Sequence, residues 1–450
     1  MRLTILGGGG FRVPLVYGAL LRDHGAGRVT GVTLYDVDRA RRTAVARVLA
    51  DQAAGVPDAP ALTVTTDLDE ALRGTDFVFS AIRVGGLAGR AQDERVALAE
   101  GVLGQETVGA GGIAYGLRTV PVAREIARRV AALAPEAWVI NFTNPAGLVT
   151  EAMAGVLGER VIGICDSPVG LGRRVARTLG VDPATARFDY VGLNHLGWLR
   201  GLYVDGRDQL PRLLGDPALL GSFEEGRLFG PEWLAPLGAV PNEYLHYYYF
   251  NRETVAAYRS AERTRGAFLR DQQAGFYAEV GGAAPAPGAA SAAWHRTLAE
   301  REATYMEANR DAAGMGERDE ADLESGGYEQ VALALMRAIA HDEKATLILN
   351  VRNRGTLSAL DAEAVVEVPC AVDANGARPL AANPLPLHAV GLVTAVKAVE
   401  REVLRASETG ARADAVAAFA LHPLVDSVSV ARRLVDGYVA AHPGLGYLRG

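Results

Sequence analysis

The sequence predicts an α/β protein with a doubly wound, Rossmann-type parallel sheet, followed by a second domain of the α+β class. Two observations support this prediction. Over the first 166 residues, short apolar runs typical of buried strands alternate with helix-like stretches, which is the pattern of right-handed βαβ units. The first apolar run leads directly into the glycines Gly7, Gly8, Gly9 and Gly10, which favour a dinucleotide-binding turn.

Six apolar runs are predicted to be the strands of the first domain, and six is the strand number of a doubly wound dinucleotide fold. These runs are Leu3–Leu6, Val32–Tyr35, Leu62–Thr65, Phe77–Ile82, Val139–Phe142 and Val161–Cys165. Helices are predicted between most of them, at Val13–Asp23, Asp38–Ala53, Val120–Ala134 and Ala146–Leu157. We expect residues 1–166 to bind the dinucleotide. We expect residues 167–450 to form an α+β domain that completes the substrate and metal site and makes oligomer contacts.

The pattern changes from about Phe188 onward. The runs Phe188–Leu193 and Leu199–Val204 are predicted to be antiparallel strands, and Thr346–Asn350 and Val365–Val368 to be strands of a second, smaller sheet. Amphipathic periodicity predicts helices at Thr297–Ala313, Tyr328–Ala340, Val390–Thr409 and Val425–Ala440. The stretches Gly281–Ala293, rich in Ala, Gly and Pro, and Glu317–Gly327, rich in charge, are predicted to be loops.

The composition is that of a folded globular protein, with 49% hydrophobic and 22% charged residues. The formal net charge of −7 and the absence of a basic stripe argue against a nucleic-acid partner. No apolar run reaches the ~20 residues that span a bilayer, and no signal peptide is expected before the first strand. The two cysteines, Cys165 and Cys370, are too few for a disulfide framework. We therefore expect a cytoplasmic protein without a membrane partner.

The glycine cluster and Asp36 together predict a dinucleotide site. Glycines between a first strand and a first helix let the backbone approach a pyrophosphate, which the helix N-terminus attracts. Asp36 ends the second predicted strand, where a carboxylate would accept hydrogen bonds from ribose hydroxyls and would repel a 2′-phosphate. The pattern therefore favours NAD over NADP, although a tight turn that binds no cofactor could contain the same glycines.

Two further polar residues follow predicted strands beyond this site. Cys165 ends the run Val161–Cys165, and His195 closely follows the run that ends at Leu193. Each residue alone could be an ordinary core side chain. Together, a thiolate and an imidazole at the carboxyl ends of strands suit a borderline divalent transition metal, with positions left open for substrate.

Six motifs occur in order along the chain. They are Gly7-Gly8-Gly9, Leu34-Tyr35-Asp36, Gly104-Gln105-Glu106-Thr107-Val108-Gly109, Asn141-Phe142-Thr143-Asn144-Pro145, Cys165-Asp166-Ser167-Pro168 and Gly192-Leu193-Asn194-His195. These motifs resemble family 4 of the glycoside hydrolases, the NAD- and metal-dependent 6-phosphoglycosidases. The resemblance implies a fold like that of the lactate and malate dehydrogenases, with NAD and a divalent metal, most simply Mn²⁺, as cofactors. It also implies a homo-oligomer, either a dimer or a tetramer.

The resemblance further implies a mechanism of oxidation, elimination, addition and reduction. NAD takes a hydride from C3 of the sugar, a base removes the proton on C2, and the C1–O bond then breaks. Water addition and return of the hydride complete the cycle, unlike the two-carboxylate mechanism of most glycosidases. In this scheme Cys165 and His195 bind the metal, Tyr244 within Pro241–Tyr249 is the base, and Asp166 assists the leaving group.

For the anionic group on C6, the resemblance implies Arg90, Asn144 and a second-domain arginine, Arg265 or Arg263, as substrate ligands. Guanidinium groups suit bidentate binding of a phosphate. The expected substrate is a 6-phosphoglucoside, with the β anomer preferred. A 6-phospho-α-glucosidase, or a glycosidase for another C6 anion such as a sulfonate, is the alternative, because the Asp166 motif does not distinguish the anomers.

Two alternatives come from other functional classes. An NAD-dependent 2-hydroxyacid dehydrogenase could use the same scaffold, but it would need a His–Asp proton relay in place of the metal pair. A protein that senses NAD without turnover is the other alternative.

Overall fold

The computed structural model describes residues 1–282, 286–315, 318 and 327–449. Its first strands are β1 (Arg2–Leu6), β2 (Gly31–Tyr35), β3 (Ala61–Thr65), β4 (Phe77–Ser80), β5 (Trp138–Asn141) and β6 (Val161–Gly163). They are hydrogen-bonded in the order β3-β2-β1-β4-β5-β6, and every pair is parallel. The predicted doubly wound sheet is therefore confirmed, with every strand end within two residues of its predicted position.

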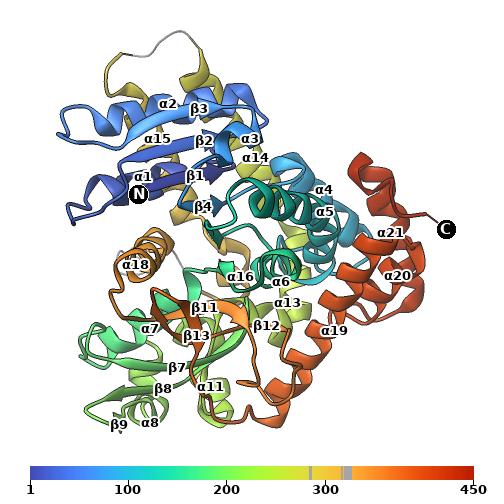
Figure 1. Ribbon diagram of the computed structural model, residues 1–450. Coiled ribbons are helices and arrows are strands. Elements are labelled where there is room, and N and C mark those ends of the chain that lie inside the picture. The colour runs from blue at the N-terminus through green and yellow to red at the C-terminus, as the bar shows by residue number, and fades with distance from the viewer. Residues whose placement is uncertain (283–285, 316–317, 319–326, 450) are drawn as a thin grey trace.

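Helices connect these strands (Figure 1). They are α1 (Val13–Leu21), α2 (Arg39–Ala53), α3 (Leu68–Leu72), α4 (Gly86–Ala99), α5 (Gly109–Leu133), α6 (Ala146–Leu157) with the 3₁₀ turn η1 (Gly158–Arg160), and α7 (Ser167–Thr178). The predicted start of α5 at Val120 is wrong, because its first turns are rich in glycine and look like a loop in the sequence. These glycines allow close packing, since a Cβ on Gly111 would lie 2.3 Å from the carbonyl oxygen of Gln105.

The second half of the chain adds antiparallel strands. They are β7 (Arg187–Leu193), β8 (Leu196–Val204), β9 (Arg207–Asp208), β10 (Val240–Pro241), β11 (Ala345–Arg352), β12 (Val365–Asp373) and β13 (Gly376–Pro379). The predicted antiparallel pairing of β7 with β8 is confirmed. The predicted second, smaller sheet is wrong, because β11 pairs with β6 and β12 pairs with β7. All strands in the described part of the chain therefore belong to one sheet, ordered β10-β8-β7-β12-β11-β6-β5-β4-β1-β2-β3 with β9 and β13 beside β8 and β12.

The two halves of this sheet are joined by single residue pairs. Asn350 on β11 pairs with Gly163 on β6, and Glu367 on β12 pairs with Gly192 on β7. The fully buried carboxylate of Glu367 accepts hydrogen bonds from Asn350 Nδ2 at 2.8 Å and from Asn194 Nδ2 at 3.1 Å. The Glu367 carboxylate therefore links β11, which pairs with β6, to Asn194, which directly follows β7.

The other described helices complete the molecule. They are α8 (Leu210–Leu214), α9 (Pro217–Leu220), α10 (Glu224–Phe229), α11 (Pro231–Leu237), η2 (Glu243–Leu245), α12 (His246–Tyr249), α13 (Asn251–Ser260), α14 (Arg265–Gly281), α15 (Ala289–Ala303), α16 (Glu307–Ala312), α18 (Tyr328–His341), α19 (Leu387–Thr409), α20 (Arg412–Ala420), α21 (Val428–Ala441) and η3 (Pro443–Leu445). The helices predicted at the positions of α18, α19 and α21 are confirmed. None of the described helices is both long and apolar enough to cross a lipid bilayer.

Two predictions fail between α14 and α18. The single helix Thr297–Ala313 is wrong, because Met306 has a φ of +51° and separates α15 from α16. The loop Gly281–Ala293 is wrong from Ala289 onward, where α15 begins. Most of the predicted loop Glu317–Gly327 lies outside the described residues.

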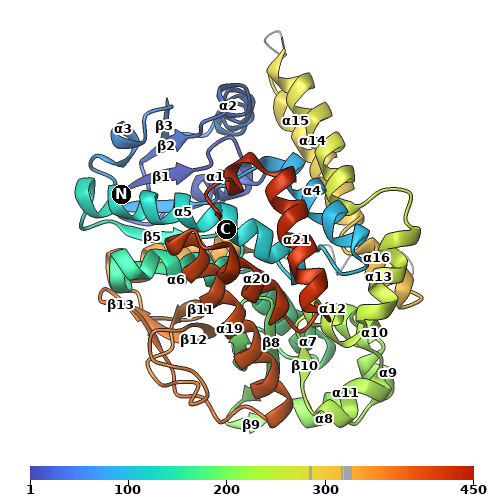
Figure 2. The same ribbon diagram turned by 90° about the vertical axis from the view of Figure 1, so that its right-hand side faces the viewer.

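Helices α14 and α15 lie side by side and pack against α2, the helix that connects β2 to β3 of the parallel sheet (Figure 2). Phe11, which follows the glycine cluster, shares a buried apolar cluster with Phe276 of α14 and Trp294 of α15. These contacts cross the expected boundary at residue 166, and the division into domains 1–166 and 167–450 stays a prediction.

A buried ion-pair cluster fastens α19 to the sheet. The Nζ of Lys397 donates hydrogen bonds to Glu151 of α6 and to the carbonyl of Val365, both at 2.9 Å, and also to Glu400. The side chains of Lys397 and Glu151 are almost fully removed from solvent.

Lys397→Met should lower the free energy of unfolding by ~3–5 kcal/mol, because it removes the buried cation shared by Glu151 and Glu400 and leaves Glu151 paired only with the partly exposed Arg401. Chemical denaturation measures this loss. Arg128→Met is the control, because Arg128 makes an exposed pair on α5 and its removal should change stability little. Equal stabilities of the two variants would contradict the structural role of the Lys397 cluster.

Candidate active site

A cleft of about 1670 Å³ lies at the carboxyl ends of the parallel strands, and helices α13, α14, α15, α16 and α18 supply part of its wall. Open α/β sheets bind ligands at this edge, where the strand order reverses. The cleft is lined by the predicted residues Gly7, Gly9, Gly10, Asp36, Arg90, Asn144, Cys165, Asp166, His195, Tyr244, Arg263 and Arg265. Gly8 lies behind the turn, where a Cβ would be 2.8 Å from Leu34 Cβ. Tertiary structure therefore brings nearly all predicted site residues together.

The glycine-rich turn between β1 and α1 has no room for side chains. Gly7 has a φ of +82°, and a Cβ at this position would lie 2.5 Å from the carbonyl oxygen of Ala81. One carboxylate oxygen of Asp36 accepts from Gly9 N at 2.8 Å, and the other accepts from Asp38 N at 2.9 Å. These bonds orient Asp36 and leave lone pairs for further donors. The turn and the carboxylate therefore fit the pyrophosphate and ribose of a dinucleotide.

The hydrogen bonds around His195 determine which of its ring nitrogens is free. Thr107 Oγ1 lies 2.7 Å from His195 Nδ1 and donates its proton to Gln105 Oε1 at 3.1 Å. That amide oxygen also accepts from the main-chain N–H groups of Thr107 and Val108, which fixes its orientation. Since the threonine hydroxyl has only one proton, it must accept from Nδ1–H. Burial lowers the pKa of His195 to about 4, so the ring is neutral near pH 7, and a proton on Nδ1 then leaves the Nε2 lone pair available to a metal.

Cys165 and His195 fit a divalent metal. Burial raises the pKa of the Cys165 thiol well above its usual range, and the carboxylates of Glu367 and Asp166 add to this effect. Burial also lowers the pKa of His195 to about 4. A bound cation would favour both the thiolate and the neutral imidazole. The described residues contain no group of three His, Cys, Asp or Glu side chains placed to hold a metal. A metal on these two residues would therefore keep positions open for substrate or water.

Tyr244 lies flat against the ring of His195, with the two ring centroids 3.6 Å apart. Its hydroxyl accepts a hydrogen bond from Tyr305 Oη at 3.1 Å, and Tyr305 Oη also lies 3.3 Å from Glu243 Oε1. Burial raises the pKa of Tyr244 well above its usual range, and the nearby Glu243 carboxylate adds to this effect. Tyr244 could therefore act as a base near neutral pH only if an adjacent cation lowered its pKa.

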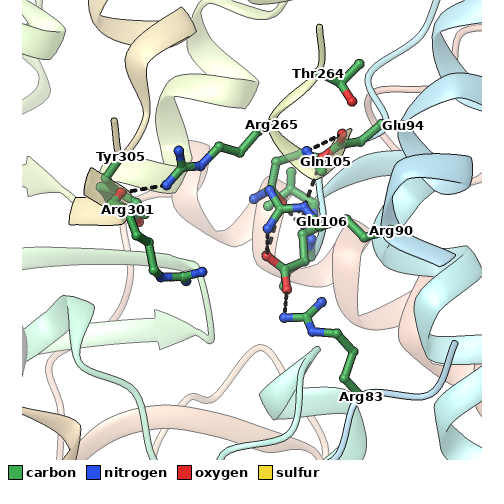
Figure 3. Close-up of polar contacts among 12 residues, drawn as sticks. Arg83, Arg90, Glu94, Gln105, Glu106, Thr264, Arg265, Arg301 and Tyr305 are labelled. Atoms are coloured by element: carbon green, nitrogen blue, oxygen red, sulfur yellow. Dashed lines mark hydrogen bonds and ion pairs between the residues drawn. The ribbon is translucent and has the colours of Figure 1, made fainter. Parts of the chain in front are cut away.

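The arginine expected to bind an anion from α4 is already paired with carboxylates. Figure 3 shows Glu106 between Arg90 and Arg83, with which it forms ion pairs. Arg90 Nε also donates to Glu94 Oε1 at 2.9 Å. The positive charge of Arg90 is therefore balanced inside the protein before any ligand binds.

The charges of Arg265 and Arg301 are less well balanced by carboxylates than the charge of Arg90. The guanidinium of Arg265 donates to Thr304 Oγ1 and, at 2.7 Å, to the carbonyl of Arg301, instead of to a carboxylate. Burial and the positive charge of Arg301 lower the pKa of Arg265 to about 9. Burial and the positive charge of Arg12 lower the pKa of Arg301 to about 10. A bound anion would reverse these shifts, so this pair is the best candidate anion site in the cleft.

Several side chains that line the cleft were not predicted from the sequence. Thr107 and Glu243 fall inside motifs that were recognised, so their positions in those motifs could have indicated them. Arg12 follows the glycine cluster and forms an ion pair with Asp166 at 3.4 Å. Arg301 had no recognisable signal, because it lies in a stretch that reads as an ordinary charged helix.

The fold and the cleft define an enzyme of the dinucleotide-binding α/β class, and the predicted metal ligands Cys165 and His195 line its cleft. Residues 2–181 match the Family 4 glycosyl hydrolase family, and residues 190–425 match the Family 4 glycosyl hydrolase C-terminal domain. The chain is 31% identical to a probable 6-phospho-beta-glucosidase of Bacillus subtilis, over 98% of this chain and 96% of that protein. It is also 31% identical to 6-phospho-alpha-glucosidase 1 of Lacticaseibacillus paracasei, over 98% and 97%. The chain belongs to family 4 of the glycosyl hydrolases and is a glycosidase.

Solved structures agree with this assignment. The structure of a 6-phospho-beta glucosidase from Thermotoga maritima with manganese, NAD+ and glucose-6-phosphate is similar, with a TM-score of 0.82 and 25% identity over 98% of each chain. A malate dehydrogenase from Plasmodium falciparum shares the fold, with a TM-score of 0.50 and 13% identity over 91% of this chain and 98% of that chain. The predicted family and the dehydrogenase-like architecture are confirmed.

Thr107→Val should weaken the binding of a divalent metal about 10- to 100-fold, because the His195 ring loses the partner that orients it. Titration with Mn²⁺ followed by electron paramagnetic resonance measures the affinity without turnover. Thr119→Val is the matched control, because Thr119 is buried in α5 and its hydroxyl has no hydrogen-bond partner among the described residues. Equal metal affinities of the two variants would contradict the role assigned to Thr107.

Proposed function

We propose that this glycosidase hydrolyses 6-phosphoglucosides with the help of NAD and a divalent metal, most simply Mn²⁺. The observation that carries the proposal is the hydrogen bond from the Arg265 guanidinium to the main-chain carbonyl of Arg301, with both arginines lining the same cleft as Cys165 and His195. Two partly buried guanidinium groups with lowered pKa values favour a ligand with two negative charges, and a phosphate monoester has this charge. Relatives named for phosphorylated glucosides support the same substrate class.

Separate groups of residues in the cleft would bind the two cofactors. Bound NAD would supply reversible hydride acceptance at C3 of the sugar, and the metal would supply a Lewis acid for the C2 and C3 oxygens. Cys165 and His195 would hold the metal, with Thr107 orienting the imidazole. Asp36, oriented by the Gly9 N–H group, would accept hydrogen bonds from the ribose hydroxyls, which supports NAD over NADP.

Tyr244 is the proposed base for the proton on C2. Its ring lies against His195 and its oxygen is held by Tyr305, so the base and a metal ligand face the same part of the cleft. Asp166 is proposed to assist departure of the leaving group, and its ion pair with Arg12 keeps this carboxylate at the cleft wall. The C2–H bond is then broken on the Tyr244 side, and the C1–O bond is broken with help from Asp166.

Further assignments complete the proposal. Arg90 and Asn144 are retained as substrate ligands, with Arg263 as the alternative to Arg265. The β anomer is preferred, and the alternatives are a 6-phospho-α-glucosidase and an enzyme for another C6 anion such as a sulfonate. Relatives named for either anomer support keeping the first alternative open.

A homo-oligomer and a cytoplasmic location are proposed on the family resemblance. The dehydrogenase and NAD-sensor alternatives are dropped, because the chain belongs to a glycosidase family.

Chromogenic 6-phosphoglucosides of both anomers should release their leaving groups only when NAD and Mn²⁺ are present, and faster for the β anomer. Arg301→Gln should raise the KM for these substrates about 10- to 100-fold, which is the effect of losing one charged hydrogen bond. Arg296→Gln is the matched control, because Arg296 is an exposed arginine on the same helix. No release from either anomer would contradict the proposed function. Equal KM values for the two variants would contradict the anion site alone.

Substrates deuterated at C2 or C3 should react more slowly, because the proposed route breaks both C–H bonds. Product formed in heavy water should carry deuterium at C2, which nuclear magnetic resonance detects. A two-carboxylate glycosidase breaks neither bond. Tyr244→Phe should lose most activity yet still bind NAD and metal. Tyr249→Phe should stay active, because the Tyr249 hydroxyl contacts Trp198 instead of the cleft. Normal rates with both deuterated substrates, together with unlabelled C2, would rule out the elimination route.

A further inference from the structure

Three aromatic side chains from the second half of the chain hydrogen-bond to the turn that follows β1. Tyr277 Oη of α14 donates to the carbonyl of Gly9 at 2.7 Å. Trp294 Nε1 of α15 donates to the carbonyl of Phe11 at 2.8 Å, and Tyr328 Oη of α18 donates to the carbonyl of Arg12 at 2.8 Å. Three separate helices therefore hold three carbonyls within residues 9–12, a segment that the sequence assigned to the nucleotide-binding domain alone.

These bonds determine where the N–H groups of the turn point. A trans peptide is planar, with its C=O and N–H groups directed to opposite sides. By holding the carbonyl of Phe11, Trp294 therefore fixes the direction of the Arg12 N–H. Within the described part of the chain, this N–H has no main-chain acceptor. It lies at the N-terminus of α1, where free N–H groups and the helix dipole favour a phosphate.

The Gly9–Gly10 peptide is held in the same way. Tyr277 fixes its carbonyl, and the N–H of Gly10 donates to the carbonyl of Gly7 at 2.8 Å. The guanidinium of Arg41 from α2 lies over the ring of Tyr277, 4.4 Å from the ring centroid. The turn is therefore closed on one side by its own hydrogen bond and on the other by a tyrosine that α2 holds in place.

Packing supports this arrangement. The ring of Phe11 meets Phe276 edge-on at 5.3 Å between centroids and also contacts Trp294, and all three side chains are buried. A glycine-rich turn has high conformational freedom when nothing holds it. Contacts that order it before binding reduce the entropy that the ligand must otherwise remove.

We propose that Tyr277, Trp294 and Tyr328 are positioning residues that pre-organise the turn for the pyrophosphate of NAD. Tyr277 and Trp294 lie outside the wall of the cleft, so they act through the main chain of the turn and not by touching the cofactor. The inference rests on the proposed function in one respect, namely that NAD is the ligand.

Two matched pairs of variants test the proposal in the full-length enzyme. Tyr277→Phe is compared with Tyr17→Phe, because the Tyr17 hydroxyl makes the same kind of bond, at 2.9 Å, to the carbonyl of Pro60 away from the turn. Trp294→Phe is compared with Trp198→Phe, because Trp198 is equally buried and its indole N–H is also bonded. Calorimetric titration with NAD gives Kd, and thermal unfolding gives Tm.

All four variants should lower Tm, since each loses one hydrogen bond of a buried aromatic side chain. Only Tyr277→Phe and Trp294→Phe should raise the Kd for NAD, by about three- to tenfold. An unchanged Kd for both would overturn the proposal, and so would an equal rise in Tyr17→Phe and Trp198→Phe. If Trp294→Phe does not fold, the tyrosine pair decides alone. A wild-type enzyme that binds no NAD would instead refute the proposed function itself.

Discussion

The architecture of the cleft depends on one buried carboxylate, Glu367, at the junction between the parallel and antiparallel parts of the sheet. Main-chain pairing across this junction is limited to single residue pairs, so side chains must hold the strands in register. Glu367 accepts hydrogen bonds from Tyr190, Asn194 and Asn350, which lie on or next to β7 and β11. Burial raises its pKa to about 7, which shows how unfavourable an isolated carboxylate would be here. The three donors offset that cost and fix the chain segments that carry the two proposed metal ligands.

Charge is distributed unevenly around this junction, and the distribution explains how an acidic chain can bind an anionic sugar. Glu94 and Glu106 balance the charge of Arg90 at close range. The guanidinium of Arg265 instead donates to the main-chain carbonyl of Arg301, and Arg301 has a looser ion pair with Glu302 at 3.6 Å. Local positive potential depends on this arrangement and not on the net charge of −7. The sheet therefore places the proposed metal ligands, and α14 and α15 place the proposed anion ligands, on the walls of one cleft.

The sequence by itself determined the parallel sheet and a set of site residues of which all but Gly8 line the cleft. Buried strands, helix periodicity and the turn that contains Gly7 are local features, and such features can be predicted from a short stretch of sequence. The motif residues Cys165, His195 and Tyr244 were also found from the sequence, because the chemistry of a metal site and a base restricts residue types strongly. All three residues line one cleft and Tyr244 lies against His195, while their individual roles stay predictions.

Only the tertiary structure decided which distant segments meet. The pairing of β11 with β6, the break at Met306 and the packing of α14 and α15 against α2 each depend on residues far apart in the chain. The same holds for charge, since nothing local distinguishes Arg90, which two carboxylates pair closely, from Arg301, whose pKa burial and Arg12 lower despite the ion pair with Glu302. The hydrophobic pattern of a segment indicates which face of that segment is buried. Register, ion pairing and pKa are set by neighbours that folding brings into contact, which is why the sequence alone could not reveal them.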